Sequence, residues 1–368
     1  MTDSQPPQNS AEQRFLAELR DAIAGRTFFL VAGVLVIQLA FVLSYVGAFH
    51  RPTPHHLPMV VAAPAPLARQ EVAALNRISG SPLTARALSS TARGLELLRS
   101  GATSGVLSMS LGSSPDTLYV AGGGGAATVT ALQDVITGAE KAAHRRLTFV
   151  DAVPAQAGDA RGLSGFYLVI GWLIGGYLAA ALLAIAHGAQ PSNTRRAAIR
   201  LIAMALYAVA SGIGGALIVG PLLGALTGHT LALWALGTLL VFAAAAVTMA
   251  FQVLAGVLGI GITVLLFVVL GNPSAGGAYQ SWLLPGFWRA IGPLIPNGAG
   301  VQAARHIVYF GGHGITGNLA VIGVYAVLGT AVAVGLSALR TRRGAGAGAG
   351  AGAAAGAAQI KAPAPLSS

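Results

Sequence analysis

The sequence predicts a polytopic α-helical membrane protein with about six transmembrane helices and an extracytoplasmic α/β domain inserted between helices 1 and 2. Three observations lead to this prediction. Of the 368 residues, 54% are apolar and only 9% are charged, whereas a soluble globular domain carries roughly 25% charged residues. Apolar stretches from residue 162 onward reach the ~20 residues that a bilayer-spanning helix needs. Residues 50–161, in contrast, have the composition of a soluble domain.

Residues 1–26 are predicted to form a cytoplasmic N-terminal segment. Its part at 10–26 reads as an amphipathic helix that suits the membrane surface, with apolar residues such as Phe15 and Ile23 on one face. Residues 27–49 are apolar, and this run is longer than the about 7–15 residues of a signal-peptide core and has no convincing cleavage site. We therefore expect transmembrane helix 1 at this position, retained as an anchor.

Residues 50–161 alternate short β-branched or apolar runs with Ala- and Arg-containing segments of helical pattern. This alternation predicts an α/β domain that can bury a modest core. A glycine run at 122–125 precedes the last helical segment and is interpreted as flexible. The predicted strands are 58–63, 83–89, 105–111, 117–121 and 147–153, and the predicted helices are 67–79, 91–100 and 126–143.

Residues 162–340 are predicted to form a membrane domain of five helices. The region 231–271 is one long apolar stretch, and a helix of about 40 residues would be about twice the thickness of the bilayer. We therefore break it at Gly256, Gly259 and Gly261, with one long tilted helix as the alternative. The expected spans are 164–187, 198–223, 231–251, 255–271 and 318–339.

The orientation follows from short loops, in which Lys and Arg mark the cytoplasmic side. Arginines cluster at 14–26, 195–200 and 340–343. Six spans place all three clusters and both termini in the cytoplasm and the α/β domain outside, which predicts a multi-pass protein of the plasma (inner) membrane. The Gly/Ala-rich segment 341–368 would then be a cytoplasmic tail, and its low complexity predicts disorder.

Residues 272–312 alternate Pro and Gly with two apolar pieces that are too short to span a bilayer. Non-helical backbone at membrane depth is tolerated only where protein covers it or where it faces water. We therefore expect a re-entrant segment at the outer face, with short helices around 281–291 and 299–310. Its two arginines should sit near the outer interface or line a polar opening, which suits either lipid anchoring or an anionic substrate. The candidate gate residues are Pro285, Trp288, Arg289, Pro293, Pro296 and Arg305.

Several classes of function are excluded or disfavoured. The chain has no cysteine, which excludes disulfides and thiolate sites, and its only lysines are Lys141 and Lys361, so it has no Walker loop for ATP hydrolysis. No catalytic motif or metal-ligand spacing occurs, so we predict no catalytic residue, cofactor or metal. The net charge of +11 comes without a basic run carrying aromatics, so nucleic acid is not an expected partner. After Asp159 the chain has no Asp or Glu, which disfavours a proton-driven pump.

Three local strings are distinctive: FHRPTPHHLPMVVAAP after the first span, FVDAVPAQAGDARGLSGFYLVIGWLIGGYLAA at the second, and GNPSAGGAYQSWLLPGFWRAIGPLIPNGAGVQAARHIVYFGG before the last. With the order of parts, they resemble the YhgE/Pip-like membrane proteins and the permease subunits of the second class of ABC-type exporters. Members of that family have one span, a large outer domain and five further spans, with a Pro/Gly-rich re-entrant segment before the last. The resemblance covers roughly residues 10–340 and implies an ABC-type exporter or an envelope-associated protein of the same build.

Two functional hypotheses follow. In the first, the chain is the permease subunit of an ABC-type exporter, forms a homodimer or heterodimer in the lipid bilayer, and docks a separate ATPase subunit. The loop at 187–200 would be the coupling element, through Pro191, Arg195, Arg196 and Arg200. In the second, the chain does not transport, and its outer domain acts as a receptor or assembly factor for a cell-envelope or secreted partner.

Overall fold

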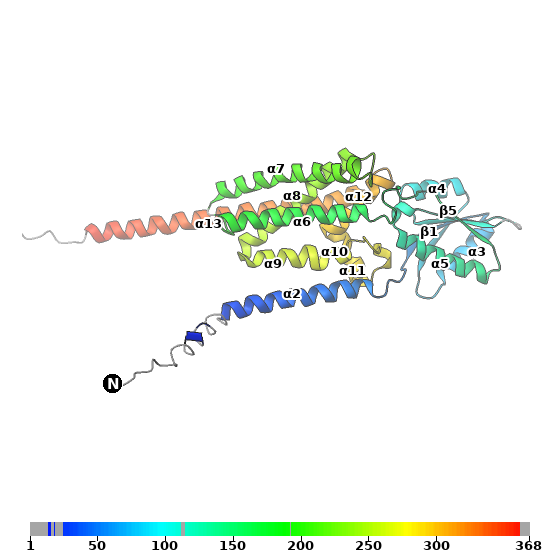
Figure 1. Ribbon diagram of the computed structural model, residues 1–368, viewed down its shortest axis with the longest axis horizontal. Helices are drawn as coiled ribbons and strands as arrows, with labels where there is room; N and C mark the ends of the chain where they lie inside the picture. Colours follow the sequence, from blue (N-terminus) through cyan, green and yellow to red (C-terminus); the bar gives the residue numbers. More distant parts are fainter. Residues whose placement is uncertain (1–13, 16–17, 19–24, 112–114, 192, 361–368) are drawn as a thin grey trace, which may run out of the picture.

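The computed structural model describes residues 14–15, 18, 25–111, 115–191 and 193–360. An α/β domain stands at one end of an elongated bundle of long helices, and the first and last long helices reach the opposite end (Figure 1). The amphipathic helix predicted at 10–26 falls mostly outside the described residues.

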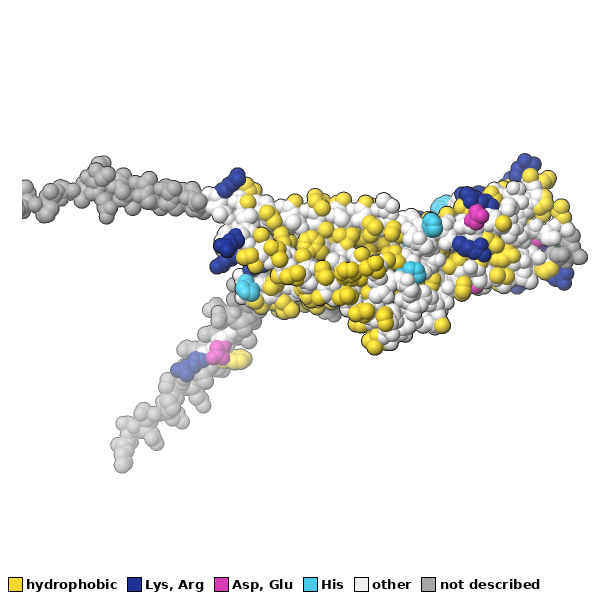
Figure 2. Space-filling model, turned by 90° about the horizontal axis from the view of Figure 1, so that it is seen from above, with side chains coloured by type: hydrophobic (Ala, Val, Ile, Leu, Met, Phe, Trp, Pro, Cys, Tyr) yellow, Lys and Arg dark blue, Asp and Glu magenta, His cyan; other side chains and the backbone are white. Residues whose placement is uncertain are grey.

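Five helices in the described part of the chain are apolar and long enough to cross a bilayer, so the chain is a helical membrane protein. Apolar side chains cover the middle of the molecule, whereas Lys and Arg gather toward its two ends (Figure 2). The five helices are α2 (Gly25–Phe49), α6 (Ser164–His187), α7 (Thr194–Leu217, continued by the π-helical turn η2, Ile218–Leu222), α8 (Thr230–Ala255) and α13 (Thr316–Ile360).

The apolar stretch at 231–271 is divided after Ala255. Gly256 has a φ of 60°, a left-handed conformation that ends a right-handed helix and that glycine adopts without strain. The second part, Leu258–Ser274, is an apolar helix that contains a π-helical stretch and is shorter than the five candidate spans. The break therefore rules out one long tilted helix, and the span predicted at 255–271 is a shorter helix than the five candidate spans.

The last helix differs from its prediction at its C-terminal end. We expected disorder from residue 341 onward, but α13 continues through the Gly/Ala-rich segment to Ile360. Alanine has the highest helix propensity, and extending an existing helix avoids the unfavourable nucleation step. Residues 361–368 lie outside the described ranges.

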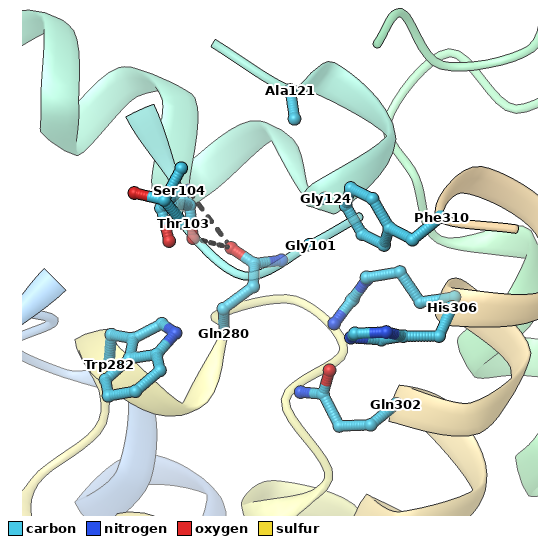
Figure 3. Close-up of a pocket in the computed structure, with 12 residues that line it drawn as sticks. Gly101, Thr103, Ser104, Ala121, Gly124, Gln280, Trp282, Gln302, His306 and Phe310 are labelled. Carbon is cyan, nitrogen blue, oxygen red and sulfur yellow. Dashed lines mark hydrogen bonds between the residues drawn. The ribbon is translucent and has the colours of Figure 1, made fainter. Parts of the chain in front are cut away.

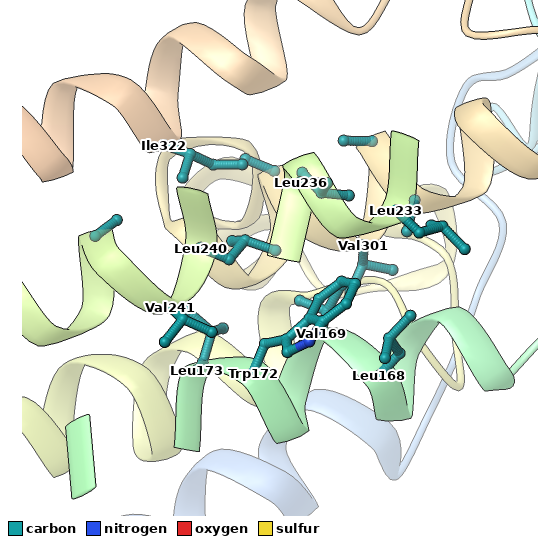
Figure 4. Close-up of a cluster of buried hydrophobic side chains, with 14 of the residues drawn as sticks. Leu168, Val169, Trp172, Leu173, Leu233, Leu236, Leu240, Val241, Val301 and Ile322 are labelled. Atoms are coloured by element: carbon teal, nitrogen blue, oxygen red, sulfur yellow. The ribbon is translucent and has the colours of Figure 1, made fainter. Parts of the chain in front are cut away.

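α8 lies at the centre of the bundle, where it packs against α6, α7 and α13. Trp172 of α6 is the largest side chain in this core (Figure 4), and its indole N–H donates a 3.1 Å hydrogen bond to the Ser211 carbonyl of α7. A Cβ on Gly215 or Gly237 would come within 2.4 Å of the indole. Glycine at these two positions thus lets a buried tryptophan fill the space between three helices.

α2 stands at the side of the bundle and exposes most of its apolar residues. Its contacts in the described structure are chiefly with the shorter helix, in the segments η3 (Leu265–Gly271) and α10 (Asn272–Ser274). At its C-terminal end Ala48 packs against Leu284 and Trp288. The first span is therefore held to the membrane block mainly through its last turns.

The α/β domain contains one five-stranded sheet in the order β2-β1-β3-β4-β5. All neighbouring strands are parallel except β3 and β4. The strands and helices overlap the predicted ranges. They are β1 (Leu57–Ala62), α3 (Ala65–Asn76), β2 (Leu83–Leu88), α4 (Thr91–Arg99), β3 (Gly105–Ser108), β4 (Asp116–Val120), α5 (Ala126–Ala142) and β5 (Leu147–Asp151).

Alternate residues of the central strand β1 face two different cores, as the period of two in a strand requires. Leu57, Met59 and Val61 join a cluster with α3 and α5, whereas Val60 and Ala62 join one with α4. Helices thus cover both faces of the sheet. The α4 side also faces the membrane block, and this determines where the candidate site forms.

Candidate functional site

The predicted re-entrant segment lies between the membrane block and the α/β domain. It consists of η4 (Ser281–Leu283), α11 (Gly286–Ile291), η5 (Gly292–Leu294) and α12 (Pro296–Tyr309). Three of its prolines stand where helical pieces begin, positions at which the missing N–H costs no intrahelical bond. Pro285 is the N-cap of α11, Pro293 lies at the start of η5, and Pro296 is the first residue of α12.

The two candidate gate residues on α11 have different surroundings. Trp288 is buried against Ala48 and Leu284, so it fixes the end of α2 to the re-entrant segment. Arg289 is half-buried, and its Nη1 is buried without a hydrogen-bond partner among the described residues. The structure does not bring Arg289 into the cavity that Arg305 lines.

Arg305 of α12 is 7% exposed. Its Nη2 donates a 3.1 Å hydrogen bond to the Gly276 carbonyl, and no ion pair within the described residues includes it. A buried guanidinium has five donors and normally has an anionic partner. Arg305 is therefore a buried cation on which the negative charge of Asp159 acts, although the two form no ion pair and guanidinium donors of Arg305 stay unused within the described residues.

Gln280 connects the loop before η4 to the α/β domain (Figure 3). Its Oε1 accepts from the backbone N–H of Thr128 at 3.0 Å and from the Thr128 hydroxyl at 2.9 Å. Both donors belong to the first turn of α5, whose backbone N–H groups need acceptors from outside the helix. A side chain of the membrane block thus caps a helix of the α/β domain.

The glycine run at 122–125 forms this interface, and the expectation that it is flexible was wrong. A Cβ on Gly123 would lie 2.3 Å from Cδ1 of Tyr309, and one on Gly125 would lie 2.0 Å from Nε2 of Gln280. Gly125 also has a φ of 122°, which other residues adopt only with strain. The run is an ordered turn that lets α12 and Gln280 approach the backbone of the α/β domain.

The C-terminal end of α12 enters the α/β domain directly. Phe310, which follows α12, is buried in the same cluster as Leu98 of α4 and Val60 of β1. The Tyr309 hydroxyl donates a 2.6 Å hydrogen bond to Asp159, in the segment that leads from the domain to α6. The other end of α12 packs among α6, α8 and α13. One helix therefore belongs to the cores of both parts of the molecule.

A small polar cavity, called here the junction cavity, lies where these segments meet. Its volume is about 80 Å³, enough for several waters or one small polar group. Polar side chains from both parts of the molecule face it (Figure 3). The residues that line it include Gly101, Thr103, Ser104, Gln280, Gln302, Arg305 and His306.

The predicted coupling loop lies at the opposite end of the bundle, where basic side chains gather (Figure 2). Pro191 is buried, and Asn193 caps α7 by accepting the Arg196 backbone N–H at 2.9 Å. Arg200 is 8% exposed and donates a 2.9 Å hydrogen bond to the His187 carbonyl. Arg195 and Arg196 are exposed. Arg196, Arg200 and His187 line a cavity of about 480 Å³, so this end has both a basic surface and a recess.

A buried charged group also occurs inside the α/β domain. Arg145 pairs with both carboxylate oxygens of Asp116. Glu140 is 2% exposed, and neither of its oxygens has a hydrogen-bond partner within the described ranges. Burial, together with the nearby charges of Asp116 and Glu71, raises the pKa of the Glu140 carboxyl to about 7.

The contact between Gln280 and Thr128 had no signal in the sequence, because nothing in their spacing indicates that they meet. The glycine run at 122–125 was a nearby feature that the sequence analysis singled out. Among the described residues no group of His, Asp and Glu could hold a metal ion.

Comparisons of the chain with models of known protein families, with curated proteins and with solved structures find no match.

Proposed function

We propose that this protein is the permease subunit of an ABC-type exporter in the plasma (inner) membrane, energised by a separate ATPase subunit. The observation that supports this proposal is the position of α12, which packs in the membrane core and ends in the core of the α/β domain. A displacement of the bundle would therefore be passed directly to the domain.

The proposed energy source acts at the basic end. Exposed Arg195 and Arg196 and the recess beside Arg200 offer a charged, concave surface to a cytoplasmic partner. Both termini would lie on this side, and the α/β domain would lie outside. The exposed apolar face of α2 suits a neighbouring copy or a related subunit as well as lipid, in keeping with a dimer in the bilayer.

The test is recovery of the partner. A tagged chain purified from its own cells in mild detergent should bring an ATPase with it, and the double variant R195Q/R196Q should lower the recovered ATPase by about tenfold or more. The matched control is R86Q, which removes an exposed arginine from the α/β domain. If no ATPase is recovered with the wild-type chain, or if both variants recover it equally, the proposal is wrong.

A second candidate is a receptor or assembly factor that does not transport. The observation that favours it is β5, an edge strand of the sheet on which Phe149 and Val150 are 45% and 42% exposed. Exposed strand edges are common sites for an added strand from a partner. In this case the variant F149S should abolish capture of an envelope partner, and R195Q/R196Q should leave function unchanged.

A further inference from the structure

We infer that the junction cavity binds a phosphate group that retains one hydroxyl, as inorganic phosphate and phosphate monoesters do. The inference goes beyond the proposed transport function, because the site does not depend on an ATPase or on movement of the bundle. It is based on the hydrogen-bond donors that line the cavity and on the acceptor nitrogen of His306.

Arg305 brings a buried positive charge to the junction cavity. The guanidinium of Arg305 is 7% exposed, lines the cavity and uses one Nη2 hydrogen bond on Gly276. Within the described part of the chain it has no carboxylate partner in an ion pair. A buried cation is unfavourable unless an anion accompanies it. The charge of Asp159 acts on Arg305. The oxygens of Asp159, however, accept from the Tyr309 hydroxyl and the Ser164 N–H. An anion in the cavity would accept from the remaining guanidinium donors.

Neutral hydrogen-bond donors also line the cavity. Ser104 and Gln302 line the cavity, and neither side chain has a hydrogen bond to another described residue. They come from different parts of the molecule, because Ser104 precedes β3 and Gln302 lies on α12. Together with Arg305 they present hydroxyl, amide and guanidinium donors from both sides of the cavity. Several donors from different directions suit a tetrahedral oxyanion better than a planar carboxylate.

His306 adds a hydrogen-bond acceptor to the cavity lining. Nδ1 of His306 lies 2.6 Å from the carbonyl oxygen of His313. Because a carbonyl only accepts, Nδ1 must carry the proton, and in the neutral ring Nε2 is then an acceptor. No hydrogen bond to Nε2 occurs within the described residues. An acceptor beside these donors favours a ligand that also donates, and the P–OH of a phosphate monoanion does so, whereas sulfate and the phosphate of a phosphodiester do not.

The cavity volume of about 80 Å³ suits a single group of this size. Two sources share the chemistry: free phosphate from solution, and the monoester headgroup of phosphatidic acid from the membrane. Phosphatidylglycerol is a phosphodiester and lacks a P–OH, so it is the lipid control.

The experiment uses the full chain, purified in detergent and freed of phosphate, or placed in phosphatidylcholine nanodiscs. Thermal stability is measured with inorganic phosphate, with sulfate, and with nanodiscs that contain equal fractions of phosphatidic acid or phosphatidylglycerol. We expect stabilisation by phosphate, by phosphatidic acid or by both, and at least about tenfold weaker binding of sulfate. Protection by phosphate alone or by phosphatidic acid alone identifies the source and supports the site.

The variants separate binding from folding. R305Q should abolish the effect of phosphate, but it also leaves the Gly276 carbonyl without its donor. Q302A removes a side chain that has no hydrogen bond within the described structure, so it should melt as the wild type does without ligand and should bind phosphate about tenfold more weakly. Q70A, on an exposed residue of α3, is its control. The inference is overturned if neither phosphate nor phosphatidic acid stabilises the chain, if sulfate equals phosphate, or if Q302A binds phosphate as Q70A does.

Discussion

The hydroxyl of Tyr309 donates a hydrogen bond to Oδ2 of Asp159 at 2.6 Å, although 150 positions separate them in the sequence. The other oxygen of Asp159 accepts the backbone N–H of Ser164 at 2.8 Å, at the start of α6. Asp159 is 3% exposed and is the last acidic residue of the chain. One buried carboxylate thus holds the linker from the α/β domain, the first turn of α6 and the end of α12 together.

The variant Y309F should therefore lower stability. Its ring keeps its packing, but an oxygen of the buried Asp159 loses its donor, and an unpaired buried acceptor costs about 1–3 kcal/mol. The measurement is thermal unfolding in detergent. Y167F is the control, because Tyr167 is 65% exposed and its hydroxyl has no hydrogen bond to a described residue. Equal melting temperatures for the two variants would contradict the proposed role of this contact.

The glycine run gives a second prediction. G123A places a Cβ 2.3 Å from Cδ1 of Tyr309, and overpacking of this kind typically costs about 1–3 kcal/mol. We expect a lower melting temperature and faster proteolysis of the linker near Asp159. G138A is the opposite case, since Gly138 lies inside α5 with open space around it. Alanine there should raise stability by up to about 1 kcal/mol, so a stable G123A protein would show that the close contact is not needed.

The buried carboxyl of Glu140 predicts a pH dependence. Its pKa is raised from 4.5 to about 7 in the folded domain, so the folded state holds the proton more tightly than the unfolded chain does. The stabilisation is complete below about pH 4.5 and is lost as the pH rises through 7, with an upper limit of about 3 kcal/mol. Above about pH 7, E140Q should therefore melt at a higher temperature than the wild type. This difference should shrink or change sign as the pH falls.

E96Q is the matched control for that series, because it removes an exposed carboxylate from the same domain. A constant difference between E140Q and the wild type from pH 4 to pH 8 would contradict the burial of an ionisable Glu140, whatever the absolute stability.

The orientation of the chain is tested in its natural cysteine-free background. Arg86→Cys lies on the exposed surface of β2, and Arg342→Cys is exposed near the basic end of α13. A membrane-impermeant thiol reagent added to intact cells should label position 86 at once and position 342 only after the membrane is permeabilised, because Arg-rich short segments stay in the cytoplasm. The reverse pattern would place the α/β domain inside.

Local patterns in the sequence predicted most of the elements. The strands of the α/β domain follow β-branched runs that end at turn residues. A break within 231–271 follows from length, because this largely apolar stretch of 41 residues exceeds one span, and glycine marks its position at Gly256. The Gly/Ala-rich segment beyond residue 340 shows the limit of composition. Low complexity argues for disorder in isolation, but the segment follows a stable helix and extends it.

The contacts between the membrane block and the α/β domain could not be predicted from the sequence, for a physical reason. The Gln280–Thr128 pair bridges 152 positions, and periodicity reports only the face of an element, not which distant element meets it. Arg289 and Arg305 were predicted to sit near the outer interface or to line a polar opening; the structure places Arg305, but not Arg289, beside the junction cavity. The glycine run was misread because glycine is used both where a backbone must move and where another group must come close.

The lack of side chains at Gly123 and Gly125 affects how the α/β domain can move relative to the bundle. Two surfaces that meet through long side chains can slide by exchanging rotamers, but Gly123 and Gly125 meet Tyr309 and Gln280 with no rotamers of their own. The α/β domain and α12 should therefore move together as one rigid body. The distance between two spin labels, one on the α/β domain and one on the far end of α6, would then report a change in the tilt of a membrane helix.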